Sequence, residues 1–198
     1  MLVMIEGIDG TGKTSVVNSL KDYFYVEEAL FLHTPSDFIR ETLLGNKLDP
    51  IAKFFLFIGD MIDMREMLCR QSTEKIVFLD RFFVSTFVYQ IALGNMSDEE
   101  KRVAIKAIQT YLPKFDHTFI LTAKTEVAMQ RSETRGIPAD SFESAKIGVW
   151  EKRKQAYENI CFSEISEMLG NVTVLDTTNY PVERTTEVIK RVVSTRKN

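Results

Sequence analysis

Cysteine is scarce in this chain: only Cys69 and Cys161 occur among its 198 residues. The two lie far apart in the sequence and in no spacing typical of a metal site, so we expect two buried, reduced thiols rather than a disulfide framework. An excess of charge of one sign is also missing, since the formal net charge is −3. This balance argues against nucleic acid as a partner, because duplex nucleic acid favours a basic face, but it allows a single nucleotide.

Long apolar runs are absent as well. The longest lies around residues 54–58, far below the roughly 20 residues that a membrane-spanning helix needs. Residues 1–5 are apolar but lead at once into a glycine-rich turn, without the charged start and cleavage site of a secretory signal. Repeats and linkers rich in Gly, Pro or Ser are missing too. We therefore expect one domain over residues 1–198, cytoplasmic and without a membrane partner.

Apolar runs and helical periodicities alternate along the chain. Short runs predict strands at residues 2–5, 29–33, 76–79, 118–121 and 171–175, and those at residues 2–5 and 76–79 are expected to be buried. Helical spacing predicts helices at residues 14–24, from residue 50 to the Cys69 region, at 85–92 and 98–112, and around residues 127, 150 and 188. This alternation predicts an α/β fold in three layers, with a five-stranded parallel sheet flanked by helices.

The strongest motif spans residues 7–14, Gly-Ile-Asp-Gly-Thr-Gly-Lys-Thr, which match G-x-x-x-x-G-K-[ST] between a predicted strand and a predicted helix. Its glycines let consecutive amides point at phosphate oxygens, and the helix start adds its own amides. Lys13 is expected to reach the β- and γ-phosphates, and the Thr14 hydroxyl to bind Mg²⁺. The expected binding site for a nucleoside triphosphate comprises Gly7, Ile8, Asp9, Gly10, Thr11, Gly12, Lys13 and Thr14.

A second pattern, Asn-Lys-Leu-Asp at residues 46–49, spells the guanine-reading motif of GTPases. In a GTPase it should follow a late strand, whereas here it precedes the strand at residues 76–79. Asp49 is instead well placed to cap a helix that begins at Pro50. A turn followed by a helix cap is therefore the better interpretation, and a GTPase is a poor fit.

Three segments resemble thymidylate kinases. Residues 5–14 are similar to the opening of that family, which has Glu-Gly before the loop and an acid within it. Residues 79–90 resemble its Asp-Arg segment that ends in Tyr-Gln, and residues 126–136 are similar to the helix that enters its lid. The resemblance implies a P-loop kinase fold with a short lid at about residues 136–142. It also implies ATP as the phosphoryl donor, Mg²⁺, and a homodimer that phosphorylates dTMP to dTDP for dTTP synthesis.

The same resemblance suggests roles for single residues. Asp80, at the end of a predicted strand, would hold Mg²⁺ together with Thr14. Arg81 could make a two-pronged contact with the acceptor phosphate, and Asp9 would contact the acceptor sugar and phosphate region. Arg131 would lie near the adenine ring. Further acceptor contacts are expected from Ser85, Tyr89 and Gln90. The alternatives are a helix cap for Asp80, a surface salt bridge for Arg81 and a solvated basic helix end for Arg131. Ordinary helix packing is the alternative for Ser85, Tyr89 and Gln90.

Departures from the family pattern leave the acceptor open. Residues 33–40 replace the Arg-Glu-Pro-Gly-Gly common among bacterial relatives, although Arg40 could still touch the acceptor phosphate. Phe57 is present to stack on a base, but the arginine expected four residues later is Met61, and Arg65 is the candidate substitute.

The usual sources of a catalytic arginine are also missing, since Gly10 and the segment at residues 140–143 lack it. Arg135, one helical turn after Arg131, is therefore our hypothesis for the transition state, and the expected catalytic residues are Lys13, Arg81, Arg135 and Asp9. The basic residues on the next helix favour a solvated face, although one of them could reach the phosphates; they are Lys146, Lys152, Arg153 and Lys154. Two alternatives stay open: a kinase for another (deoxy)nucleotide or a nucleoside, and a nucleotide-binding protein with impaired transfer.

Overall fold

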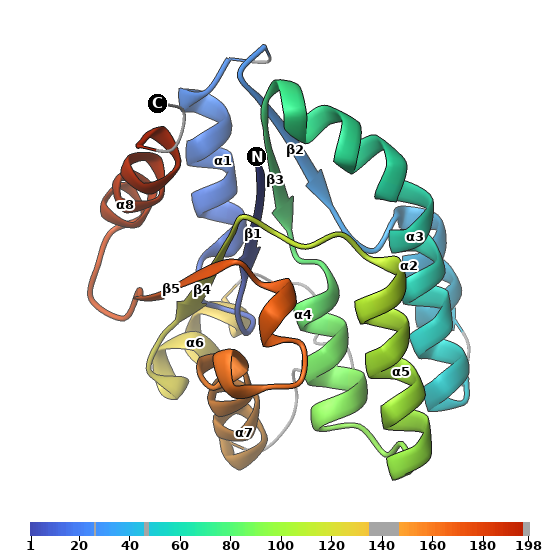
Figure 1. Ribbon diagram of the computed structural model, residues 1–198. Helices are drawn as coiled ribbons and strands as arrows, with labels where there is room; N and C mark the ends of the chain where they lie inside the picture. Colours follow the sequence, from blue (N-terminus) through green and yellow to red (C-terminus); the bar gives the residue numbers. More distant parts are fainter. Residues whose placement is uncertain (26, 46–47, 135–146, 196–198) are drawn as a thin grey trace.

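The predicted strands form a parallel sheet in the order β2-β3-β1-β4-β5 (Figure 1). The computed structural model describes residues 1–25, 27–45, 48–134 and 147–195. The strands are β1 (Leu2–Glu6), β2 (Ala29–His33), β3 (Ile76–Asp80), β4 (His117–Thr122) and β5 (Asn171–Asp176). The predicted α/β fold with five parallel strands is therefore confirmed.

Helices connect consecutive strands, as parallel pairing requires. They are α1 (Lys13–Tyr23), α2 (Asp37–Gly45), α3 (Pro50–Glu74), α4 (Phe83–Thr86), the π-helical η1 (Phe87–Ala92), α5 (Asp98–Tyr111), α6 (Thr125–Glu133), α7 (Ile147–Glu158), the 3₁₀ turns η2 (Ile160–Phe162) and η3 (Ser166–Met168), and α8 (Val182–Ser194). The sequence does not predict α2, whose nine residues follow a proline closely and make little more than two turns. Asp49 caps α3 as expected, because its Oδ1 accepts from the amide of Ile51 at 3.0 Å; the first two residues of the GTPase-like motif lie outside the described residues.

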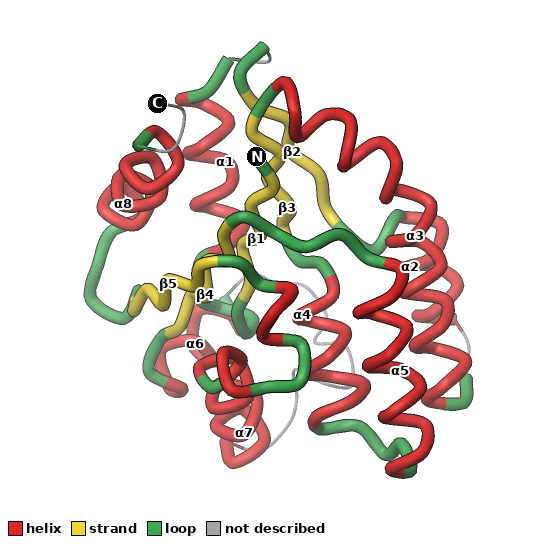
Figure 2. Tube along the Cα trace, viewed as in Figure 1, coloured by secondary structure: helices red, strands yellow, loops and turns green. Residues whose placement is uncertain are grey.

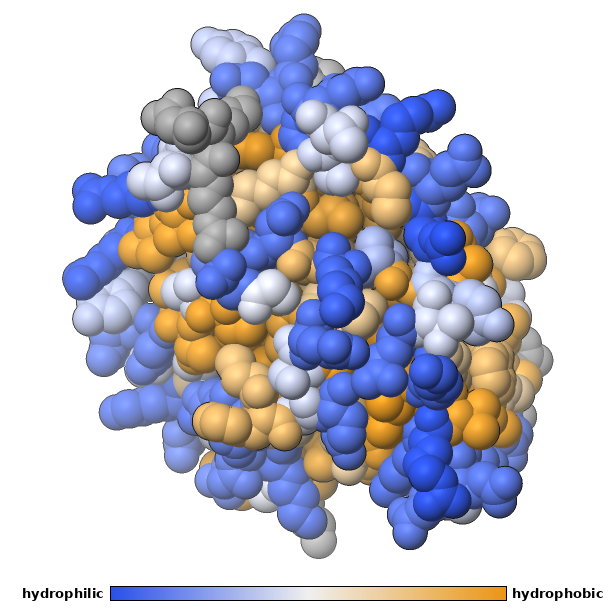
Figure 3. All heavy atoms as spheres, viewed as in Figure 1, coloured by the Kyte–Doolittle hydropathy of each residue, from blue (hydrophilic) through white to orange (hydrophobic). Residues whose placement is uncertain are grey.

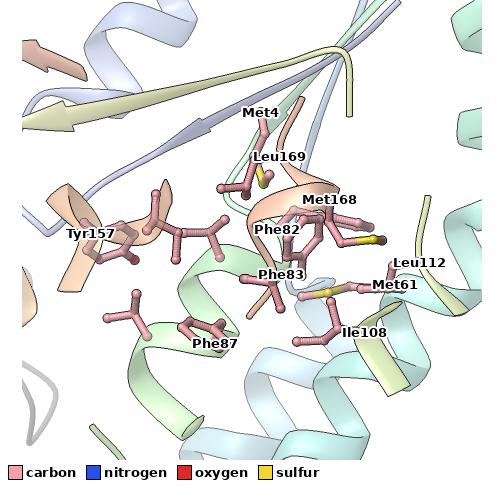
Figure 4. Packing of buried hydrophobic residues seen from close by; sticks show 14 of the residues in the cluster. Met4, Met61, Phe82, Phe83, Phe87, Ile108, Leu112, Tyr157, Met168 and Leu169 are labelled. Atoms are coloured by element: carbon pink, nitrogen blue, oxygen red, sulfur yellow. The ribbon is translucent and has the colours of Figure 1, made fainter. Parts of the chain in front are cut away.

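The sheet lies between two helical layers (Figures 1 and 2). β1 is buried along its whole length, with Val3 and Ile5 facing a core shared with α1 and α8. Leu2 and Met4 face the larger core beneath α3, α4, η1, α5 and α7. Figure 4 shows this larger core. Since helices cover both faces of the sheet, a ligand can approach it at the ends of the strands. The loops after β1, β3, β4 and β5 all lie at the carboxyl ends of the parallel strands, on one edge of the sheet.

The layering also decides the exposure of the two cysteines. Cys69 on α3 and Cys161 in η2 are free thiols, as predicted, but both are exposed, so the prediction of buried thiols is wrong. Each lies on the solvent side of its helix. Among the described residues, none of the helices combines the length and the apolar character that crossing a bilayer requires.

Candidate active site

The loop between β1 and α1 is packed tightly against β4 and α6, and this packing explains its glycines. Gly7 and Gly10 have φ values of 141° and 74°. A Cβ at Gly7 would lie 2.1 Å from the carbonyl oxygen of Leu121, and one at Gly10 would lie 1.9 Å from that of Ala128. A larger residue at either position would displace the backbone. The curled backbone that the motif predicts is therefore present.

Lys13 lies inside this loop. Its Nζ donates to the carbonyl oxygens of Gly7 and Ile8, at 2.8 and 2.7 Å, and the side chain is buried. Burial, aided by the nearby Arg81 charge, lowers the pKa of Lys13 to about 7. An anion bound in the loop would restore the charge, because an opposite charge favours the ionised form.

The predicted metal ligands lie at the same edge of the sheet. Thr14 is exposed in the first turn of α1, and Asp80 ends β3 beside Ile5 of β1. Among the described residues, no group of three or more His, Cys, Asp or Glu side chains could by itself hold a metal ion. Hydroxyl and carboxylate oxygens suit Mg²⁺, which usually takes only one or two protein ligands besides phosphate and water.

Arg81 connects β3 to the phosphate loop. Its Nη2 pairs with Asp9 Oδ1, and its Nη1 donates to Ser85 Oγ at 3.0 Å and to the Gly7 carbonyl oxygen at 3.4 Å. The Arg81 side chain keeps 23% of its surface exposed. This guanidinium is therefore held in a fixed position at the loop while part of it stays accessible to a ligand.

The Ser85 hydroxyl is fully used within the protein. It donates to Glu6 Oε2 at 2.6 Å, accepts from Arg81, and lies 2.8 Å from Tyr157 Oη. Because its single hydrogen goes to Glu6, Tyr157 must be the donor in the last contact. Tyr157 comes from α7 and was not predicted as a site residue; its one sequence signal is an aromatic on the apolar side of that helix.

Tyr89 lies beside Tyr157, with ring centroids 6.3 Å apart. Burial raises the pKa of Tyr89 to about 12, and its Oη has no hydrogen-bond partner among the described residues. The Arg153 guanidinium carbon lies 5.2 Å from the centre of the Tyr89 ring. Arg153 is buried, so its predicted place on a solvated face is wrong: α7 turns this residue toward η1. Lys152 is exposed as predicted.

Arg131 ties α6 to the loop after β5. Its Nη2 donates to the carbonyl oxygens of Thr177 and Thr178, at 3.1 and 3.2 Å. Thr177 Oγ1 in turn lies 3.0 Å from the carbonyl oxygen of Thr11 in the phosphate loop. The structure thus brings Arg131 near the loop. Arg135, Lys146 and the expected lid lie outside the described residues.

The other residues predicted to contact the acceptor have no hydrogen bond to the loop between β1 and α1 within the described part of the chain. Phe57 is half-buried and packs against the larger core, and Arg40 is exposed on α2. Met61 is buried in that core, where Figure 4 shows it near Ile108 and Leu112. Arg65 donates to the carbonyl oxygen of Tyr111, at 3.3 Å, so it contacts the end of α5 rather than the site. Gln90 is half-buried in η1.

Comparisons with known proteins identify the family of the chain. The family model described as thymidylate kinase matches residues 5–189. A thymidylate kinase of Chlorobium chlorochromatii is 34% identical over 180 residues, covering 79% of this chain and 80% of the relative. A probable thymidylate kinase of Methanocaldococcus jannaschii is 31% identical over 204 residues, covering 100% and 96%.

Solved structures are similar in fold at low identity. The thymidylate kinase from Candida albicans has a TM-score of 0.75 at 20% identity, covering 99% of this chain and 92% of the other. A structure described as deoxyadenosine kinase from M. mycoides has a TM-score of 0.70 at 17% identity, covering 98% and 100%.

Proposed function

The chain belongs to the thymidylate kinase family, and from this premise we propose that it transfers the γ-phosphoryl group of ATP to dTMP, forming dTDP and ADP. One observation carries the proposal. Lys13, which serves the donor phosphates, and Arg81, which would serve the acceptor phosphate, both donate to the carbonyl oxygen of Gly7, at 2.8 and 3.4 Å. Two side chains that would bind phosphate therefore converge on a single atom at the turn of the loop.

Phosphoryl transfer depends on positioning and charge neutralisation more than on covalent chemistry. Amides of residues 10–14 and Lys13 would hold the donor phosphates, and Arg131 would lie toward the adenine. Arg81, fixed by Asp9, would orient the acceptor phosphate in line with the γ-phosphate. Thr14 and Asp80 would hold Mg²⁺, which when bound neutralises charge on the transferring group.

The lid completes the proposal. We propose a single kinase domain over residues 1–198, whose lid at about residues 136–142 closes over the transferring phosphate and excludes water. Arg135 would then stabilise the transition state. Replacing Arg135 with alanine should lower turnover by orders of magnitude without changing the thermal midpoint, and near-normal turnover would remove it from this role. Because ATP and dTMP are cytoplasmic metabolites, we also propose the cytoplasm as the place of action.

The acceptor is tested by assaying ADP formation with Mg²⁺, ATP and a panel of nucleosides and nucleoside monophosphates. Fastest turnover with dTMP is expected, and Lys13→Ala should abolish it. One observation favours a different acceptor: Met61 stands in the core where the family's pattern has an arginine. Turnover with another acceptor but not with dTMP would favour that alternative, and ATP binding without transfer to any acceptor would indicate an impaired kinase.

A homodimer is the proposed assembly. Adjacent helices carry exposed apolar side chains, and Figure 3 shows apolar atoms on the side of the molecule formed by α3 and α5. These side chains are Phe38 on α2, Phe55 and Ile62 on α3, and Val103 and Tyr111 on α5. A second copy would cover this surface. Sedimentation should show a dimer that Phe55→Glu disrupts, whereas Phe162→Glu, at a side chain 88% exposed in η2, should leave it intact.

A further inference from the structure

Glu6, the last residue of β1, is a carboxylate with none of its surface exposed. A buried carboxylate requires hydrogen-bond donors. Its Oε1 accepts from the amides of Phe82 and Ser85, at 2.7 and 3.1 Å, and its Oε2 accepts from Ser85 Oγ at 2.6 Å. The Phe82 amide belongs to the turn between β3 and α4, which carries Arg81, and the two Ser85 donors belong to α4, the helix that this turn begins.

The backbone of this turn is strained at Arg81. Its φ is 66°, a left-handed conformation that residues other than glycine rarely adopt. Such a residue persists only where its surroundings hold it. The Arg81 amide donates to the Ile5 carbonyl oxygen at 3.1 Å, and the Arg81 carbonyl oxygen accepts from Thr34 Oγ1 at 3.0 Å. Glu6 holds the next amide, that of Phe82. Both peptide groups beside Arg81 are therefore anchored.

We propose, on the basis of the proposed function, that Glu6 is a positioning residue for phosphoryl transfer: it holds the strained turn that aims Arg81 at the acceptor phosphate. Glu6 directly precedes Gly7, so the acceptor-side turn and the donor loop are both fixed to the end of one strand. Displacement of a reacting group by about 1 Å can cost about 100-fold in rate, which makes such a common anchor valuable.

Other roles for Glu6 fit the structure less well. Both carboxylate oxygens already accept hydrogen bonds from Phe82 or Ser85, and no part of the side chain reaches solvent, so Glu6 does not face a substrate or a metal ion. Burial raises the pKa of Glu6, while the Arg81 charge and the three donors oppose that shift. Anchoring of the backbone turn needs an acceptor atom at the right distance, whereas the charge of Glu6 is secondary.

Two substitutions of Glu6 separate the position of its acceptor oxygens from its negative charge. Glu6→Gln keeps an acceptor oxygen within reach of the Phe82 and Ser85 amides but removes the charge. Glu6→Asp keeps the charge but withdraws the oxygens by one methylene. We expect Glu6→Gln to keep the KM for dTMP within about threefold of the parent, and Glu6→Asp to raise it about tenfold or more with a lower kcat. The KM for ATP should stay within about twofold in both.

The parent and Val3→Ala provide the controls. Val3 is buried on the same strand but faces the other core, so Val3→Ala destabilises the protein without touching the turn and should leave both KM values unchanged. Absence of dTMP turnover by the parent would refute the proposed function but not the role of Glu6. The KM values of the variants would then be compared for the nucleoside monophosphate that the parent does phosphorylate. A larger defect in Glu6→Gln than in Glu6→Asp, equal defects for both substrates, or parent-like values in both variants would overturn the role of Glu6.

Hydrogen exchange at the Phe82 amide gives a second readout if Glu6→Asp does not fold. In Glu6→Gln this amide should stay as protected as in the parent, since the carboxamide oxygen can still accept. Exchange more than about tenfold faster, with an unchanged KM for dTMP, would show that the turn needs no anchor at Glu6 and would overturn the proposal.

Discussion

Arg81→Lys tests the arrangement of the two phosphate sites most directly. A lysine keeps the positive charge at the end of β3 but has one compact group of three donors in place of the five-donor fork of arginine. In the structure, Arg81 bonds Asp9, Ser85 and Gly7 at once, and its partial exposure leaves donors for a ligand. A lysine cannot hold the loop and also bind two oxygens of an acceptor phosphate.

The size of the defect follows from the bonds that are lost. A hydrogen bond to a charged group contributes about 1.5–3 kcal/mol. If lysine retains one of the two bonds to the acceptor phosphate, kcat/KM for dTMP should fall roughly 10- to 150-fold, at about 1.4 kcal/mol for each factor of ten. The KM for ATP should change little, because Lys13 and the loop amides remain.

Initial rates of ADP formation, with dTMP varied at saturating Mg²⁺ and ATP, measure this change. Arg65→Lys is a matched control, because Arg65 is exposed and its Nη1 donates to the Tyr111 carbonyl oxygen at the end of α5, at 3.3 Å. This variant should stay within about twofold of the parent. A kcat/KM for dTMP within about threefold of the parent in Arg81→Lys, or an equal rise in both KM values, would refute the reasoning.

Three further predictions concern the loop and its surroundings. Because burial lowers the pKa of Lys13 to about 7, most of the ligand-free protein carries a neutral amine at pH 8. Nucleotide binding should then take up close to one proton and weaken as the pH rises from 7 to 9. Calorimetry in buffers of different ionisation enthalpy measures this proton uptake, and finding none would contradict the prediction. Gly10→Ala should abolish nucleotide binding, because its Cβ would lie 1.9 Å from a backbone oxygen of α6; Gly59→Ala on α3, where the space is open, should bind normally and gain about 0.5–1 kcal/mol in urea denaturation. Arg153→Met should lower stability by about 2 kcal/mol through loss of the buried cation over Tyr89, and an unchanged denaturation midpoint would count against that contact.

Local patterns predicted most of the fold and the curled loop between β1 and α1. The strand signal is clearest in β1, which is buried on both faces and contains no polar residue before Glu6, and it is weaker in β5, which carries Asn171 and Thr173 and has no fully buried residue. The phosphate loop is equally local, since its glycines, Lys13 and the start of α1 are consecutive in the chain. Asp49 and Pro50 marked the start of α3 for the same reason.

The surroundings of Ser85 and Tyr89 depended on contacts between distant segments. The sequence alone placed Arg153 on a solvated face, because neighbouring residues on α7 are charged, yet α7 packs on η1 and buries it over Tyr89. Ser85 meets Glu6 across 79 residues and Tyr157 across 72. Periodicity shows which side of a helix is apolar but not which partner that side will face. The partners of Ser85 were decided by the pairing of β1 with β3 and by the packing of α7. These two features bring Glu6 and Tyr157 within hydrogen-bonding distance of Ser85.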